Sequence, residues 1–284
     1  MSLSKIIDNK KKSDILEILH YLKEQDFGFF TSEPENFPNI DFSLNDFPEI
    51  IKNSIIDFDK NSEHDLRSIL NQLSELGCLT VELRFFDAIT QEIFLKYLSY
   101  FKTSPVRTLN IVLKYSSWTT CKNMDQILLT NKRLSKVIVH NSPKKLLQKL
   151  NHQILIFTTE NILDASCCGN ISPYYFQSNI DFYKEALTSN TCLDKKVCVD
   201  SGGNIKNCPV MKSSYGHISN TKIKNCLDNE HFKKLWQIKK DDIEICKDCE
   251  FRYICPDCRA FTISGDIYSK PKKCSYDPYT NLWN

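Results

Sequence analysis

The sequence predicts an α/β protein whose middle part forms a partial, barrel-like (β/α) domain. Between residues 46 and 163, β-rich runs and amphipathic segments alternate at a spacing of roughly 25 residues, which is typical of βα units around a mainly parallel sheet. About five such units fit, too few for a complete eight-unit barrel. Residues 164–284 form a separate part, because only Cys78 and Cys121 of the 13 cysteines precede them.

The periodicity of the middle part divides it into elements. Alternating or continuous apolar residues predict strands over residues 54–59, 79–86, 108–115, 136–140 and 153–158. Apolar residues at helical spacing predict helices near residues 66–76, 93–101 and 124–129. Gly77 suits the C-terminal end of the first helix.

The sequence of residues 1–45 predicts a helix followed by a short β-rich run. Ser13 is a suitable N-cap, and residues 26–31 (DFGFFT) make the β-rich run. The apolar stripe of the helix consists of Ile15, Leu16, Ile18, Leu19 and Leu22. A small winged-helix-like segment that binds a leader peptide would show this pattern, and so would an N-terminal cap on the next domain.

Composition and charge exclude several classes of function. The net charge of +2 gives no field that would favour nucleic acid or an anionic membrane as a partner. The N-terminus lacks the apolar core of a signal peptide, and no stretch approaches the ~20 apolar residues of a membrane span. We therefore expect a cytoplasmic protein. In a reducing cytosol, clustered cysteines indicate metal binding rather than disulfides.

The C-terminal cysteines have the spacing of metal ligands. Cys246 and Cys249 form one C-x2-C pair, Cys255 and Cys258 form another, and Cys274 follows. A C-x2-C turn brings two thiolates to one side of the backbone, where they can bind one ion or cluster. Spacing alone favours zinc, whereas the all-cysteine inventory favours iron–sulfur. We expect His217 and His231, which lie outside the cysteine spacing, to be surface or packing residues.

Two further cysteines precede these pairs. Ten residues separate Cys192 from Gly203, and four separate Gly203 from Cys208. Residues 196–207 between them predict a hairpin, which would return Cys208 close to Cys192.

Together these cysteines resemble the SPASM domain, found at the C-terminus of many peptide-modifying radical SAM enzymes. The run CKDCEFRYICPDCRAF and the later KPKKCSYDPYTNLW look most like the SPASM-domain peptide maturases of grasp-with-spasm systems. The likeness covers about residues 165–284 and is weaker over residues 1–164. One departure is that two residues, where the family has three, separate Cys255 from Cys258.

The resemblance implies two 4Fe-4S clusters. One cluster would take Cys246, Cys249, Cys255 and Cys274. The other would take Cys192, Cys208 and Cys258, with Cys168, Cys198 or Cys167 as its fourth ligand and Cys168 as our first choice. Cys198 lies between two valines and can equally be a buried thiol.

The cysteine motif of radical SAM enzymes is missing. Where C-x3-C-x2-C would follow the first strand, residues 60–65 (KNSEHD) contain no cysteine. His64 and Asp65 are better explained as a solvated helix start than as ligands. The middle part thus resembles a degenerate radical SAM barrel.

The likeness implies maturation of a ribosomally made precursor peptide, together with an ATP-grasp ligase. A redox enzyme acting on a peptide and a zinc-stapled interaction domain are the alternatives. No catalytic set is recognisable, and Glu82 and Arg84 are expected to form an ion pair within the sheet rather than to line a barrel mouth.

Overall fold

The computed structural model describes Leu16, Glu17, His20, Tyr21, Glu24 and residues 49–283. The chain divides into two compact units, residues 1–43 and 44–284. The predicted winged-helix-like segment, with its Ser13 cap and its run at residues 26–31, falls almost wholly outside the described residues and stays a prediction.

An eight-stranded, mostly parallel sheet is the centre of the second unit, which confirms the predicted α/β class. Its order is β5-β6-β4-β3-β2-β1-β7-β8. The six inner strands are parallel to their neighbours, whereas β5 and β8 pair antiparallel at the two edges. The strands are β1 (Asn53–Phe58), β2 (Thr80–Phe85), β3 (Thr108–Lys114), β4 (Leu134–His140), β5 (Leu146–Leu150), β6 (Gln153–Phe157), β7 (Lys196–Val199) and β8 (Ile205–Lys206).

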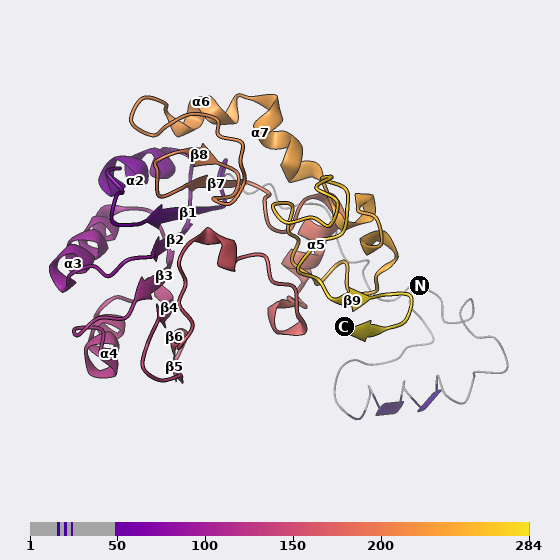
Figure 1. Cartoon of the computed structure of the whole chain (residues 1–284), viewed down its shortest axis with the longest axis horizontal. Coiled ribbons are helices and arrows are strands. Elements are labelled where there is room, and N and C mark those ends of the chain that lie inside the picture. Colours follow the sequence, from indigo (N-terminus) through magenta and orange to yellow (C-terminus); the bar gives the residue numbers. More distant parts are fainter. Residues whose placement is uncertain (1–15, 18–19, 22–23, 25–48, 284) are drawn as a thin grey trace, which may run out of the picture. The chain divides into compact units, whose positions relative to one another are not determined.

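Three helices follow β1, β2 and β3 and cover one face of the sheet (Figure 1). They are α2 (Leu66–Glu75), α3 (Gln91–Tyr100) and α4 (Cys121–Thr130), as the periodicity predicted. The side chains of Asp65, Thr90 and Thr120 cap them by accepting backbone N–H groups of the first turn. Gly77 follows α2 with φ +74°, as its predicted place at the helix end requires.

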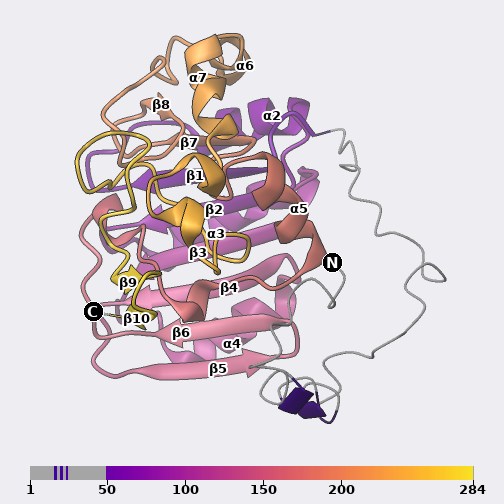
Figure 2. The same cartoon turned by 90° about the vertical axis from the view of Figure 1, so that its right-hand side faces the viewer.

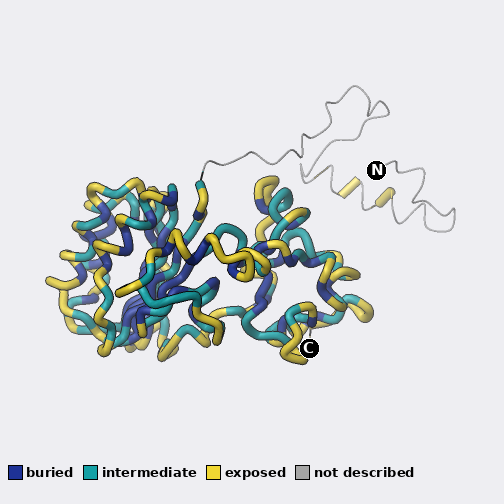
Figure 3. The backbone as a smooth tube through the Cα atoms, turned by 90° about the horizontal axis from the view of Figure 1, so that it is seen from above, coloured by how far each residue is buried: buried dark blue, intermediate teal, exposed yellow. Residues whose placement is uncertain are grey.

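Alternation along the strands gives the sheet one apolar and one polar face. Ile56, Leu83, Ile111 and Val137 point to the helices and are at most 1% exposed. Burial is concentrated along these strands and the helix faces that cover them (Figure 3). The opposite face can therefore carry chemistry without interrupting the core.

The polar face carries a buried ion pair. Arg84 Nε lies 2.6 Å from Asp57 Oδ1, and its Nη2 lies 2.8 Å from Oδ2. The expected ion pair within the sheet exists, but its acid is Asp57 rather than Glu82. The reason is register, because Asp57 is the direct neighbour of Arg84 on β1, whereas Glu82 shares a strand with it.

The cysteine-rich segment returns to this sheet. β7 pairs in parallel with β1, and β8 closes the predicted hairpin, so the sheet continues beyond residue 163. Much of the segment then lies over the face opposite α2, α3 and α4 (Figure 2), whereas residues 223–227 pack beside α2. Its remaining elements are α5 (Ile180–Thr188), α6 (Ile223–Leu227), α7 (Glu230–Lys234), β9 (Tyr276–Asp277) and β10 (Leu282–Trp283). None of the helices in the described ranges is long and apolar enough to cross a bilayer.

Replacing Arg84 tests the buried pair. We expect Arg84→Met to lower the free energy of unfolding by about 3–5 kcal/mol, because it leaves the Asp57 carboxylate buried without a partner. The double variant Asp57→Asn/Arg84→Met should recover much of this loss. Urea denaturation measures both.

The matched control is Glu82→Gln, since Glu82 is half-buried on the same strand and forms no salt bridge among the described residues. It should change stability by no more than about 0.5 kcal/mol. Equal stability of Arg84→Met and the wild type would contradict the pairing.

Candidate metal centre

All thirteen cysteines lie in the described part of the chain, and each is a free thiol. Eight of the ten cysteines named as ligand candidates fall into two neighbourhoods. Among the described residues, however, no three His, Cys, Asp or Glu side chains converge as ligands of a single metal ion would. The two groups are therefore neighbouring thiols rather than assembled coordination spheres.

The first neighbourhood contains Cys246, Cys249, Cys255 and Cys274. A 3-10 turn over Cys246–Asp248 brings the backbone N–H of Cys249 to 3.1 Å from the carbonyl of Cys246, as the C-x2-C spacing predicted. Burial raises the pKa of the Cys255 thiol to about 12, and the neighbouring Cys274 and Cys246 thiols add to this shift. Cys274 also adds to the raised pKa values of Cys246 and Cys249, in both cases after burial. Cys274 is thus the common neighbour of the other three.

The backbone before Cys246 is strained. Ile245 has φ +67° and ψ −46°, and the N–H of Cys246 lies 2.7 Å from the carbonyl of Glu244. This is a γ-turn of the rare kind with positive φ, at a β-branched residue, and such a conformation costs about 1–3 kcal/mol. The turn aims Cys246 into the first neighbourhood.

The second neighbourhood contains Cys168, Cys192, Cys208 and Cys258. Burial raises the pKa of Cys192, and the nearby thiols of Cys168 and Cys258 raise it further. Burial likewise raises the pKa of Cys208 to about 12, with Cys192 and Cys168 contributing. Gly169 (φ +84°) fits closely here, because a Cβ at this position would lie 2.8 Å from Cys258 Sγ. The chain at Cys168 therefore packs directly on Cys258.

The three candidates for the fourth ligand are placed differently. Cys168 neighbours Cys192, Cys208 and Cys258. Cys198 is fully buried, and its S–H donates to the carbonyl of Asn207 at 3.3 Å, as expected for a packed thiol. Cys167 is exposed, with Arg84 and Cys168 beside it. The arrangement favours Cys168.

A buried lysine accompanies the first neighbourhood. Lys240 Nζ lies 3.2 Å from Asp257 Oδ1, and both side chains are at most 4% exposed. Arg259 also binds this carboxylate, at 2.6 and 2.9 Å, and Asn190 donates to it at 2.7 Å. Two cations thus share one carboxylate. Burial disfavours the charge on Lys240, but Asp257, Cys255 and Cys246 outweigh it and raise its pKa.

A second lysine accompanies the other neighbourhood. Lys196 Nζ lies 3.7 Å from Cys192 Sγ, and no salt bridge to a carboxylate is found for it among the described residues. Burial opposes its charge, yet the thiols of Cys192, Cys198 and Cys208 outweigh burial and raise its pKa. An ammonium group surrounded by thiols is well placed to neutralise an anionic group that those thiols bind. The sequence analysis did not single out Lys196 as a site residue. The alternation of the predicted strand could have done so, because it places Lys196 and Cys198 on the same face.

Gly203 shapes the hairpin between Cys192 and Cys208. It has φ +81°, and a Cβ there would lie 2.7 Å from His217 Nε2. His217 donates to the carbonyl of Gly202 at 2.8 Å and accepts from Ser219 Oγ at 2.7 Å. His231 is exposed on α7. Both histidines therefore lie where packing and surface residues were expected.

The loop after β1 lines a cavity. The cavity measures about 560 Å³, and His64, Ser201 and His217 are among its lining residues. Asp65 caps α2, as a helix start should. His64 is not solvated as expected, because its ring stacks on Phe58 at 4.5 Å and burial lowers its pKa.

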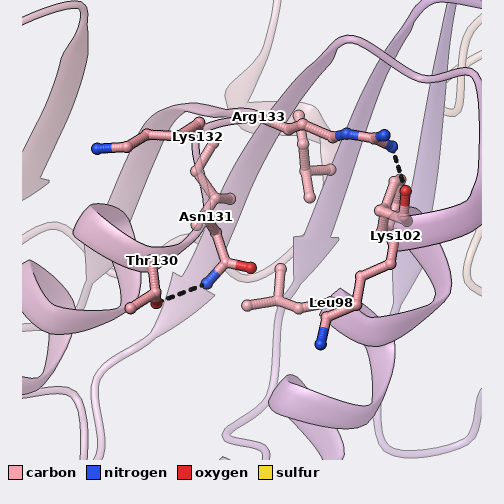
Figure 4. Close-up of a pocket in the computed structure, with 9 residues that line it drawn as sticks. Leu98, Lys102, Thr130, Asn131, Lys132 and Arg133 are labelled. Carbon is pink, nitrogen blue, oxygen red and sulfur yellow. Dashed lines mark hydrogen bonds between the residues drawn. The ribbon is translucent and has the colours of Figure 1, made fainter.

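A different cavity, of about 340 Å³, lies where β3 and β4 begin and α3 and α4 end (Figure 4). Arg133 crosses it to the backbone carbonyls of Phe101 and Ser104. Its lining contains no cysteine, so it plays no part in the candidate centre.

Two glycine substitutions test the packing at Cys258. Gly169 and Gly265 both have positive φ, but a Cβ at Gly265 would meet nothing within 4 Å. We expect Gly169→Ala to lower the free energy of unfolding by about 1–3 kcal/mol more than Gly265→Ala, because only Gly169→Ala adds a clash to the backbone cost. Equal losses in urea denaturation would show that the Gly169 turn does not contact Cys258.

No protein-family model, curated protein or solved structure matches this chain. Its function is therefore inferred from its own residues, above all from the two cysteine neighbourhoods and the cations beside them.

Proposed function

We propose that residues 164–284 form a SPASM-type domain that holds two 4Fe-4S clusters. The observation that carries this proposal is the grouping of eight free thiols into two neighbourhoods, one beside the partly buried Lys196 and the other beside the buried Lys240. The first set is Cys246, Cys249, Cys255 and Cys274, and the second is Cys168, Cys192, Cys208 and Cys258. Thiolates are the ligands that such clusters use, and buried cations offset the charge they carry.

The middle part would then be a partial radical SAM-like barrel without its catalytic cluster. The described loop from Lys60 to Asp65 contains no cysteine at the carboxyl end of β1, where three would be needed. Cys78 is fully buried beside Thr80, and Cys121 begins α4. Neither is placed to complete a three-cysteine site.

In the cell, the protein would act in the cytoplasm during maturation of a ribosomally made peptide, with an ATP-grasp ligase as its partner. This role rests on the likeness of the cysteine segment to grasp-with-spasm maturases. The precursor would bind the N-terminal segment or an exposed strand. β5 offers such a strand, because it is an edge of the sheet and Leu147 on it is 62% exposed.

Bound clusters would supply one-electron chemistry or a rigid scaffold. The chain's own contribution is to hold the thiols and to exclude water from them, since Cys246, Cys255 and Cys258 are at most 7% exposed. The Asp57–Arg84 pair underlies the second set, because Arg84 lies close enough to Cys168 and Cys198 to interact with their charge.

Cysteine replacement tests the ligand sets. We expect Cys249→Ala to lose about half of the bound iron and sulfide of anaerobically purified protein and to lower its melting temperature, because metal ligation stabilises this segment. The control is Cys226→Ala, since Cys226 is buried on α6 and donates to the carbonyl of Tyr215 outside both sets. It should keep the full iron content.

The metal bound by the wild type decides between the proposals. Iron with acid-labile sulfide and broad absorbance near ~400 nm is the expected result. Colourless protein with about two zinc ions would instead indicate a zinc-stapled interaction domain.

Incubation with S-adenosylmethionine tests the inactive barrel. With a strong reductant, the anaerobic protein should form no 5′-deoxyadenosine, because the loop after β1 offers no thiolates for a third cluster. Chromatography of the reaction mixture measures this, with an active radical SAM enzyme as the positive control. Multiple turnover would refute the inactive barrel.

A further inference from the structure

The ammonium group of Lys196 has thiols as its neighbours and no carboxylate partner among the described residues. It begins β7, and its side chain shares the polar face of the sheet with Cys198, two residues further on. Its polar contact is with Cys192 Sγ at 3.7 Å. Lys206, on the partner strand of the same hairpin, has a carboxylate of its own in Asp200, 2.7 Å away. The two lysines therefore differ in what neutralises them.

A cation with these neighbours is suited to pair with an anionic group. Removing an ammonium group from water costs several kcal/mol unless an opposite charge or hydrogen-bond acceptors replace the water. Neutral thiols are weak acceptors and supply little of this. Thiolates that bind an anionic centre would supply the opposite charge, and the ammonium group of Lys196 lies close enough to interact with them.

The first neighbourhood also has an excess of one positive charge beside it, which arises from a different set of residues. Lys240 and Arg259 both bind Asp257, so the buried group carries one more positive than negative charge. Cys246 and Cys255 lie next to Lys240. Two unrelated stretches of chain have thus placed one surplus cation beside each set of four cysteines.

We propose that Lys196 is the counter-charge of the centre held by Cys168, Cys192, Cys208 and Cys258, and that it raises the reduction potential of that centre. Lys240 does the same for the other centre. This inference rests on the proposed function. The physical reason is that reduction adds one negative charge to a cluster, and a nearby cation that is shielded from water stabilises the reduced form more than the oxidised form. Both lysines act through the clusters, so they are positioning residues rather than catalytic ones.

The experiment compares Lys196→Met and Lys196→Arg in the full-length, anaerobically reconstituted protein. Iron and sulfide are counted first, and an EPR-monitored titration with dithionite then gives the midpoint potentials. We expect Lys196→Met to move one of the two midpoints to a more negative value, and Lys196→Arg to keep it close to that of the wild type. Lys240→Met should move the other midpoint. The control Lys206→Met/Asp200→Asn, which removes a compensated lysine together with its carboxylate and so leaves the net charge unchanged, should move neither.

Each outcome decides the matter. Unchanged midpoints in Lys196→Met with full iron content would overturn the inference and leave the proposed function intact. Loss of one cluster in Lys196→Met but not in Lys196→Arg supports a role for the charge, whereas loss in both variants overturns it in favour of a purely structural role. A wild-type protein that holds no iron–sulfur cluster overturns the proposed function together with the inference.

Discussion

The pairing of β7 with β1 determines where the cysteine-rich segment lies. Ser54 and Ile55 on β1 are the direct neighbours of Val197 and Cys198 on β7, so backbone hydrogen bonds fix this register. A shift by one residue would turn Lys196 and Cys198 towards the helices and bury Val197 and Val199 on the wrong face. The position of Cys192 and Cys208 at the two ends of the hairpin follows from the same ladder.

The cysteine-rich segment has few long apolar runs, and charged side chains form much of its internal contact network. Lys240, Asp257 and Arg259 are buried charged groups of this segment, and Lys196 is partly buried. Asp57 and Arg84 form a buried pair on the sheet itself. Replacing buried ion pairs with apolar residues often stabilises a protein, so ion pairs are a poor means of stabilisation alone. Their positions beside cysteines are better explained by the centres we propose, because anionic clusters in an apolar pocket would lack compensation.

Local signals in the sequence predicted much of the fold. The five strands from β1 to β4 and at β6, together with α2, α3 and α4, carry clear periodicity and, for the helices, good caps. β5 was missed because LLQKL has no alternation, as an exposed edge strand can tolerate. The partner of β7 could not be predicted, because its pairing joins residues more than a hundred positions apart. Similarly, the C-x2-C turn at Cys246 is local, whereas the choice of Cys168 over Cys198 depends on how Gly169 packs against Cys258.

The γ-turn at Ile245 has a consequence for how the protein matures. A β-branched residue held at positive φ favours release of the turn whenever nothing restrains Cys246. If the protein holds the clusters we propose, the stretch around Ile245 would be inclined to open before iron and sulfide are bound, and the donor of these atoms would meet an accessible thiol. Ligation of Cys246 would then close the turn and hold Ile245 in its strained conformation. In this way the strained γ-turn at Ile245 would set the order of events, with assembly of the proposed cluster preceding the final folding of this stretch.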